Sequence, residues 1–311
     1  MAKIAATMPE PVVFRVQNRV SEKKTERTPD IKETEVMYRF IGRSLLIAAL
    51  VTFAGVSVFA QRDKDRSLSC RQDNWYNDRL VGNCEIREQT LAPSGGTIAI
   101  DGRQNGGVSV KGWDQNQILI RARVQTGAPT AAEAEALAKQ IRIETSGAKI
   151  FASGPESRRD YHWDVSYEVF VPRRADLSVE TQNGGISIVE VNGRIDFTAL
   201  NGGVVLKRVG GAVRGSTTNG GLVVELSGDR WDGESLDVST TNGGVIMSVP
   251  ENYSAHLQTG TVNGSVNVDF PVTVQGRLTK QIALNLGSGG ATVKAMTTNG
   301  GVHLKRISAN E

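Results

Sequence analysis

The sequence predicts an all-β protein, a β-solenoid (β-helix-like) with short repeated coils and one short helix inserted near residues 131–139. Two observations carry the prediction. The motif Asn-Gly, a small residue and an aliphatic-x-aliphatic triplet occurs six times, and the first four intervals between copies are 18, 18, 23 and 21 residues. Such intervals suit one coil of two or three short strands. The copies begin at Asn183, Asn201, Asn219, Asn242, Asn263 and Asn299.

Each Asn-Gly pair is expected to form a corner, because these residues tolerate the left-handed backbone region. A hairpin interpretation would make the pairs type I′ turns between antiparallel strands. A solenoid instead stacks the six asparagines as a structural corner ladder that hydrogen-bonds coil to coil. The threonine pairs before three corners, such as Thr217-Thr218, favour the solenoid, because stacking in register explains their recurrence.

The aliphatic triplets predict a narrow core. Their first and third residues should point inward, where each fully buried aliphatic side chain contributes about 1.5–3 kcal/mol. The middle residues should point outward, and three neighbouring copies place Val205, Val223 and Ile246 there. These three residues are either covered by another segment or form a binding strip, to which Trp231 is added as a nearby aromatic. The interval between residues 263 and 299 contains a degenerate copy at residues 288–293.

The region before the repeats continues the alternating pattern, with strands expected near residues 97–100, 108–110, 118–124 and 165–171. One helix interrupts them. Thr130 followed by Glu133 is a capping box, and the Ala-rich run to about Lys139 favours a helix.

Residues 37–60 have the features of an export signal. A short basic segment begins at Met37, an uncharged apolar stretch follows, and Val58-Phe59-Ala60 ends it with small-residue spacing. Residues 1–36 are then a disordered or misassigned extension. Residues 44–60 could alternatively stay uncleaved as a signal anchor in the inner membrane. Either interpretation places residues 61–311 outside the cytoplasm, in the periplasm, in the medium or on the cell surface.

Charge and cysteine content agree with export. Residues 1–43 carry nine Lys and Arg against six Asp and Glu, which accounts for the whole formal net charge of +3. The exported part is neutral, which argues against nucleic acid as a partner. The two cysteines, Cys70 and Cys84, are expected to form a disulfide in an oxidising compartment. No residue pattern predicts a metal or cofactor.

The recurrent Thr-Asn-Gly-Gly units, together with Asn105-Gly106-Gly107-Val108 and the export signal, resemble the bacterial putative-adhesin family. That family is a domain of unknown function built as a β-solenoid, and the resemblance spans about residues 90–306. It implies surface exposure and carries over no catalytic residues. The expected organisation is an extension (1–36), a signal peptide or anchor (37–60), a disulfide-containing lead segment (61–90) and an adhesin-like solenoid (91–308).

The predicted function is a non-enzymatic exported protein that binds a surface or envelope polymer or protein. An alternative is a carbohydrate-active enzyme, since Asp229, Asp232 and Glu234 flank Trp231 in one loop and β-helical enzymes place carboxylates beside an aromatic platform. A further alternative is a membrane-anchored envelope sensor, which requires the apolar segment to be retained.

Overall fold

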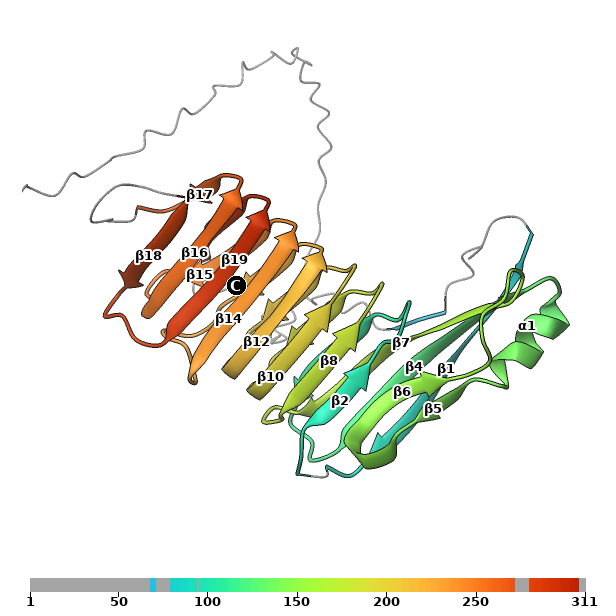
Figure 1. The fold of residues 1–311 in the computed structure, drawn as a ribbon. Helices are drawn as coiled ribbons and strands as arrows, with labels where there is room; N and C mark the ends of the chain where they lie inside the picture. Colours follow the sequence, from blue (N-terminus) through green and yellow to red (C-terminus); the bar gives the residue numbers. More distant parts are fainter. Residues whose placement is uncertain (1–67, 71–78, 94, 272–279, 308–311) are drawn as a thin grey trace, which may run out of the picture. The chain divides into compact units, whose positions relative to one another are not determined.

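The computed structural model describes residues 68–70, 79–93, 95–271 and 280–307. The expectations for residues 1–60, including the export signal, lie outside these residues. The described chain is mostly β, as expected, and forms two large sheets with one short α-helix (Figure 1).

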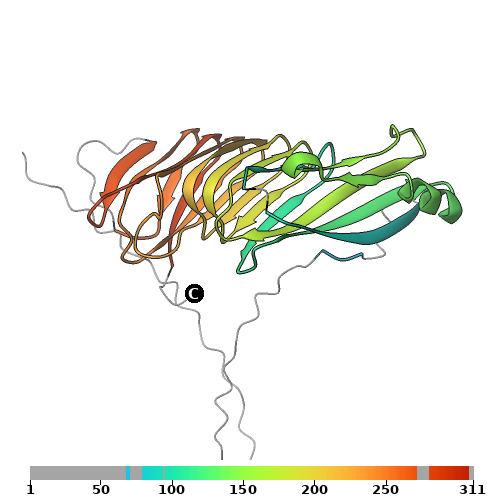
Figure 2. The same cartoon turned by 90° about the horizontal axis from the view of Figure 1, so that it is seen from below.

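Each sheet has ten strands, and Figure 2 shows the two layers from below. The first sheet has the spatial order β1 (Val81–Leu91), β4 (Ile118–Ala128), β7 (His162–Pro172), β3 (Val108–Trp113), β9 (Ile186–Val189), β11 (Val204–Lys207), β13 (Leu222–Glu225), β15 (Val245–Pro250), β20 (Val302–Ile307) and β17 (Val266–Val268). The second has the order β18 (Gln281–Leu286), β16 (Ala255–Asn263), β19 (Thr292–Asn299), β14 (Ser235–Asn242), β12 (Gly210–Asn219), β10 (Asn192–Ala199), β8 (Leu177–Thr181), β2 (Ile98–Asp101), β6 (Lys149–Ser153) and β5 (Arg142–Glu144).

From β8 to β15 the chain alternates between the two sheets. Each strand pairs in parallel with the strand two elements further along, so β9, β11, β13 and β15 are neighbours in the first sheet. Equivalent repeat residues therefore lie side by side. Leu222, for example, pairs with Val204 on one side and Val245 on the other.

The last two strands in the chain do not follow the sequence order. Strand β19 lies between β14 and β16 (Figure 1). In the first sheet, β20 lies between β15 and β17. Asn299 consequently pairs with both Asn242 and Asn263. The expectation of a degenerate copy at residues 288–293 is wrong, because Thr292 begins a strand of the second sheet, whereas the six triplets lie in the first.

The core lies between the sheets and contains the predicted inward residues. Ten of the twelve are buried, and the exceptions, Val266 and Val268, are half-buried because β17 is the edge strand. A row of threonines borders this core. The hydroxyl groups of Thr217, Thr240 and Thr297 each donate to the carbonyl of a corner glycine at 2.7 Å, whereas the equivalent position in β10 is Ala199.

The corner glycines are needed for close packing and not, as expected, for a left-handed backbone. Among the six Asn-Gly pairs only Gly300 has a positive φ, at +157°. A Cβ on Gly220, however, would lie 2.2 Å from the carbonyl oxygen of Gly202 in the preceding Asn-Gly corner. The left-handed residues occur at the opposite corners, where Glu190 has φ +57° and Arg208 has φ +50°.

The predicted helix is α1 (Ala131–Ala138), and the Thr130 side chain accepts a hydrogen bond from the Glu133 N–H, which confirms the cap. Strand β1 contributes Arg87, whose guanidinium donates to the carbonyl of Ala138 (2.8 Å), the last residue of the helix, and to that of Ile141 (2.5 Å), which follows it. A short 3₁₀ turn spans Ser146–Ala148. No helix within the described part of the chain has the length and apolarity needed to cross a bilayer.

Candidate functional surface

The outer face of the first sheet carries three aliphatic side chains in one row. Val205 pairs with Val223, and Val223 pairs with Ile246. Their neighbours in the triplets are buried, so these three point away from the core. Ile246 is 37% exposed, and the two valines are half-buried. We call Val205, Val223 and Ile246 the aliphatic row.

Polar residues border the aliphatic row. Ser187 continues it at one end and His303 at the other. Two residues further along the strands, Lys207 and Glu225 form an ion pair at 3.3 Å. The surface therefore offers an apolar strip with a polar rim, an arrangement suited to docking through hydrophobic contact.

The corner asparagines are all exposed and lie where strands of the second sheet end and the chain passes to the first sheet. Their spatial order is Asn105, Asn183, Asn201, Asn219, Asn242, Asn299 and Asn263. From the second asparagine onward, each Nδ2 donates to the Oδ1 of the asparagine before it in this order, at 2.7–3.1 Å. We call this line the asparagine ladder. Its exposure makes each bond worth about 0.5–1.5 kcal/mol and not the larger penalty of a buried unsatisfied group.

Trp231 does not have the exposure that was expected of a binding residue. Trp231 is only 5% exposed, and its Nε1 donates to the Gly211 carbonyl at 3.0 Å. The indole is part of the core, so Trp231 cannot extend the binding strip or serve as an aromatic platform. Asp232 accepts a hydrogen bond from Asn192 at 2.5 Å.

The carboxylates of this loop also lack features of a catalytic acid. Asp229 forms an ion pair with Arg230 at 3.2 Å, and the hydrogen bond from that guanidinium lowers the pKa of Asp229. A general acid needs the opposite shift. Asp229 and Glu234 are both exposed.

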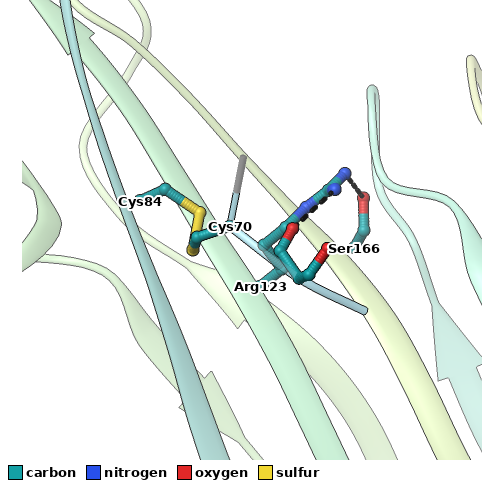
Figure 3. The surroundings of a disulfide bond; sticks show 5 residues. Cys70, Cys84, Arg123 and Ser166 are labelled. Carbon is teal, nitrogen blue, oxygen red and sulfur yellow. Dashed lines mark hydrogen bonds between the residues drawn. A yellow bond between two sulfur atoms is a disulfide. The ribbon is translucent and has the colours of Figure 1, made fainter. Parts of the chain in front are cut away.

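Cys70 and Cys84 form a disulfide that ties the segment before β1 to β1 itself, an edge strand of the first sheet (Figure 3). Arg123 lies beside it, with Nη1 donating to the Ser69 carbonyl and Nη2 to the Ser166 hydroxyl, both at 3.5 Å.

A buried polar cluster on β4 and β7 was not predicted, because its members alternate with core residues and have the pattern of a solvent-facing side. Asp164 is 5% exposed and pairs across the strands with Gln125, whose buried Oε1 has no hydrogen-bond partner among the described residues. Burial raises the pKa of Asp164 to about 7, against the opposing charge of Arg123. A protonated Asp164 can supply the donor that Gln125 lacks.

A line of alternating charges runs along the opposite corners. Arg173 contacts Asp114 at 2.7 Å and Glu190 at 2.5 Å, while Arg208 contacts Glu190 at 3.1 Å and Glu225 at 2.9 Å. The hydrogen bond from Arg173 lowers the pKa of Glu190. The 18-residue spacing of Glu190 and Arg208 matches the repeat, so the line could have been found from the sequence.

A surface hollow of about 1030 Å³ lies near the first rung of the ladder and is lined by Asp101, Arg103, Asn105 and Glu180, among others. Arg103 is already engaged there, since it pairs with Asp101 at 3.5 Å and lies 4.7 Å from the Phe151 ring centre. Within the described residues, no group of three or more His, Cys, Asp or Glu side chains is arranged to hold a metal ion.

No family model matches the sequence. No curated protein matches it either. Among solved structures, a "putative cell adhesion protein" from Clostridium sporogenes is 12% identical and covers 72% of this chain and 100% of its own, with a TM-score of 0.38. A "putative adhesin" from Bacteroides fragilis is 12% identical, with 72% and 97% coverage and a TM-score of 0.35.

A third structure, a "putative lipid binding protein" from Parabacteroides distasonis, is 11% identical, with 71% and 96% coverage and a TM-score of 0.32. The descriptions of the first two agree with the resemblance drawn from the motifs, and none of the three is described as an enzyme. With TM-scores below 0.5, these likenesses carry no argument about what this chain binds.

Proposed function

We propose that this chain is a non-enzymatic, extracytoplasmic binding protein of the adhesin type, and that the aliphatic row attaches it to a surface or envelope polymer or protein. The observation that carries the proposal is the row itself. Three aliphatic side chains lie in register on the outer face of a sheet, where polar residues are the norm.

The repeated units form a β-solenoid in this proposal. Support comes from the alternation of strands between two sheets, the parallel pairing of each strand with the second strand after it, and the asparagine ladder along the corners. Such a scaffold presents a flat and rigid face, which lowers the entropic cost of binding an extended partner.

The disulfide supports an extracytoplasmic location, because such bonds persist in oxidising compartments. Export with cleavage after Ala60 is part of the proposal. The N-terminal residue of protein recovered from the native cell tests it. Recovery of residues 1–60 on the protein would favour the anchored form instead.

The test of the aliphatic row is Val223→Lys. Ser239→Lys, on the outer face of the second sheet, is the matched control, since both positions are half-buried and in the middle of a strand. We expect Val223→Lys to abolish attachment of the labelled protein to envelope preparations from the native cell, and Ser239→Lys to leave it unchanged, with little change of Tm in either.

Three results would contradict this proposal. If Val223→Lys attaches as well as the unsubstituted protein, the aliphatic row is not part of the binding surface. A large loss of stability would mean that the row is core, covered by another segment. If the protein cleaves an envelope polysaccharide and loses that activity on Asp229→Asn, it is an enzyme.

A further inference from the structure

The last rung of the asparagine ladder is held by fewer hydrogen bonds than an interior rung. An interior rung is held on both sides: Asn242 donates through Nδ2 to Asn219 at 2.8 Å and accepts at Oδ1 from Asn299 at 2.8 Å. Asn263 is the last rung. It donates to Asn299 at 2.8 Å, and no donor within the described part of the chain contacts its Oδ1.

The main chain shows the same difference. After Asn219 and Asn242 the glycine N–H is occupied: Gly220 donates to the Asn242 carbonyl at 3.1 Å, and Gly243 donates to the Asn299 carbonyl at 3.0 Å. For the Gly264 N–H, the described residues offer no acceptor. Asn263 and Gly264 are also both exposed to solvent.

We infer that Asn263-Gly264 is a site of spontaneous deamidation in the folded protein, and that the interior Asn-Gly corners are protected from the same reaction. The reactive groups are adjacent in the chain. Hydroxide removes the proton from the Gly264 nitrogen, which then attacks Cγ of Asn263. An N–Cγ bond forms, the Cγ–Nδ2 bond breaks, and the amide nitrogen leaves as ammonia after taking a proton from water.

The product of this step is a cyclic imide. Water adds to one of its two carbonyl carbons and opens the ring, which leaves aspartate or isoaspartate at position 263. No oxidation or reduction occurs. Glycine favours the attack because it has no Cβ to hinder the approach of its nitrogen to the side chain.

The ladder decides which corner reacts, because the asparagine side chain must rotate toward the following nitrogen. At Asn242 this rotation breaks two side-chain hydrogen bonds, and the Gly243 N–H must also leave its acceptor. At Asn263 it breaks one side-chain bond. The product carboxylate cannot donate to Asn299, so deamidation also removes the last bond of the ladder.

The test is to incubate the folded full-length protein at mildly alkaline pH and to quantify Asp and isoAsp by peptide mapping with mass spectrometry. Asn219 and Asn242 are internal controls with the same Asn-Gly pair, which is followed by a second glycine where Asn263-Gly264 is followed by Ser265. We expect Asn263 to react at least about tenfold faster than either control, since two additional hydrogen bonds hold each of them. In urea-unfolded protein the three rates should converge.

A variant separates the ladder from simple exposure. Asn299→Ala removes the side-chain partner of Asn263 and should accelerate the reaction at Asn263 further, while Asn219, two rungs away, keeps its rate. Equal rates at Asn263, Asn219 and Asn242 in the folded unsubstituted protein would overturn the inference, as would a rate at Asn263 that Asn299→Ala leaves unchanged in a folded variant.

Discussion

Adjacent glycines of one corner are expected to respond differently to the same substitution. A Cβ on Gly220 would lie 2.2 Å from the Gly202 carbonyl oxygen and 2.8 Å from the Gly203 nitrogen, both main-chain atoms of the neighbouring coil. A Cβ on Gly221 would come no closer than 3.6 Å to the Gly244 carbonyl oxygen, an ordinary contact. Neither glycine has a positive φ.

The magnitudes follow from these distances. Overpacking against atoms that can move costs about 1–3 kcal/mol. Here the neighbouring coil is itself held by hydrogen bonds, so Gly220→Ala should cost about 3 kcal/mol or more. Gly221→Ala should stay within about 0.5 kcal/mol, and the reduced entropy of its unfolded chain favours a small gain. The last-but-one copy in sequence already has Ser265 at the second glycine position.

Urea denaturation of the two variants measures the difference. Gly220→Ala should shift the midpoint to lower urea with an unchanged slope, and Gly221→Ala should unfold near the original midpoint. Equal losses in the two variants would show that the corner glycines are there for backbone conformation and not for close approach between coils.

Further predictions concern the ladder, the threonine row and the buried cluster. Asn219→Ala should cost about 1 kcal/mol in thermal or urea unfolding because it removes two ladder bonds, whereas Asn267→Ala, on the outer face of an edge strand, should cost under about 0.5 kcal/mol; equal costs would count against the ladder. Ala199→Thr should raise stability by about 0.5–1.5 kcal/mol, because the new hydroxyl can donate to the Gly184 carbonyl as the other threonines of the row do; a loss would mean that this position has no room for it. Burial raises the pKa of Asp164 to about 7, so the folded state keeps a proton that the unfolded state releases near pH 4, and stability falls as pH rises between these values. Asp164→Asn should therefore match the unsubstituted protein below about pH 4 and exceed it above about pH 7, by on the order of 4 kcal/mol, and parallel pH profiles of the two would contradict the raised pKa.

The sequence was sufficient to predict the β class, the strands before the repeats, the helix cap and the inward residues. Alternation of aliphatic and polar residues specifies which side of a strand is buried, whatever its neighbours are. The capping box is equally local, because Thr130 and Glu133 contact one another directly. Local patterns of this kind can be interpreted without knowing the spatial order of the strands.

The spatial order of the strands could not be predicted from the repeats. The triplets ending in Met247, Val268 and Leu304 are similar, so each fits beside any other, and the 36-residue interval between Asn263 and Asn299 allows the chain to return to an interior position. Trp231 was wrongly predicted to be exposed for a related reason. Its charged neighbours indicated an exposed loop, but the Gly211 carbonyl of another coil receives its indole N–H.

The interior positions of β19 and β20 are the most distinctive feature of the two sheets, and engineered disulfides test them directly. Ile246 pairs with His303, while Asn267 lies on the far side of His303. Neighbouring strands are about 4.8 Å apart, within disulfide range, whereas strands two positions apart exceed the limit of about 7 Å. The Ile246→Cys/His303→Cys variant should form the new bond under mild oxidation, as shown by peptide mapping, and Ile246→Cys/Asn267→Cys should not. The reverse result would mean that the strands of the first sheet follow the sequence order and that β20 lies at the edge.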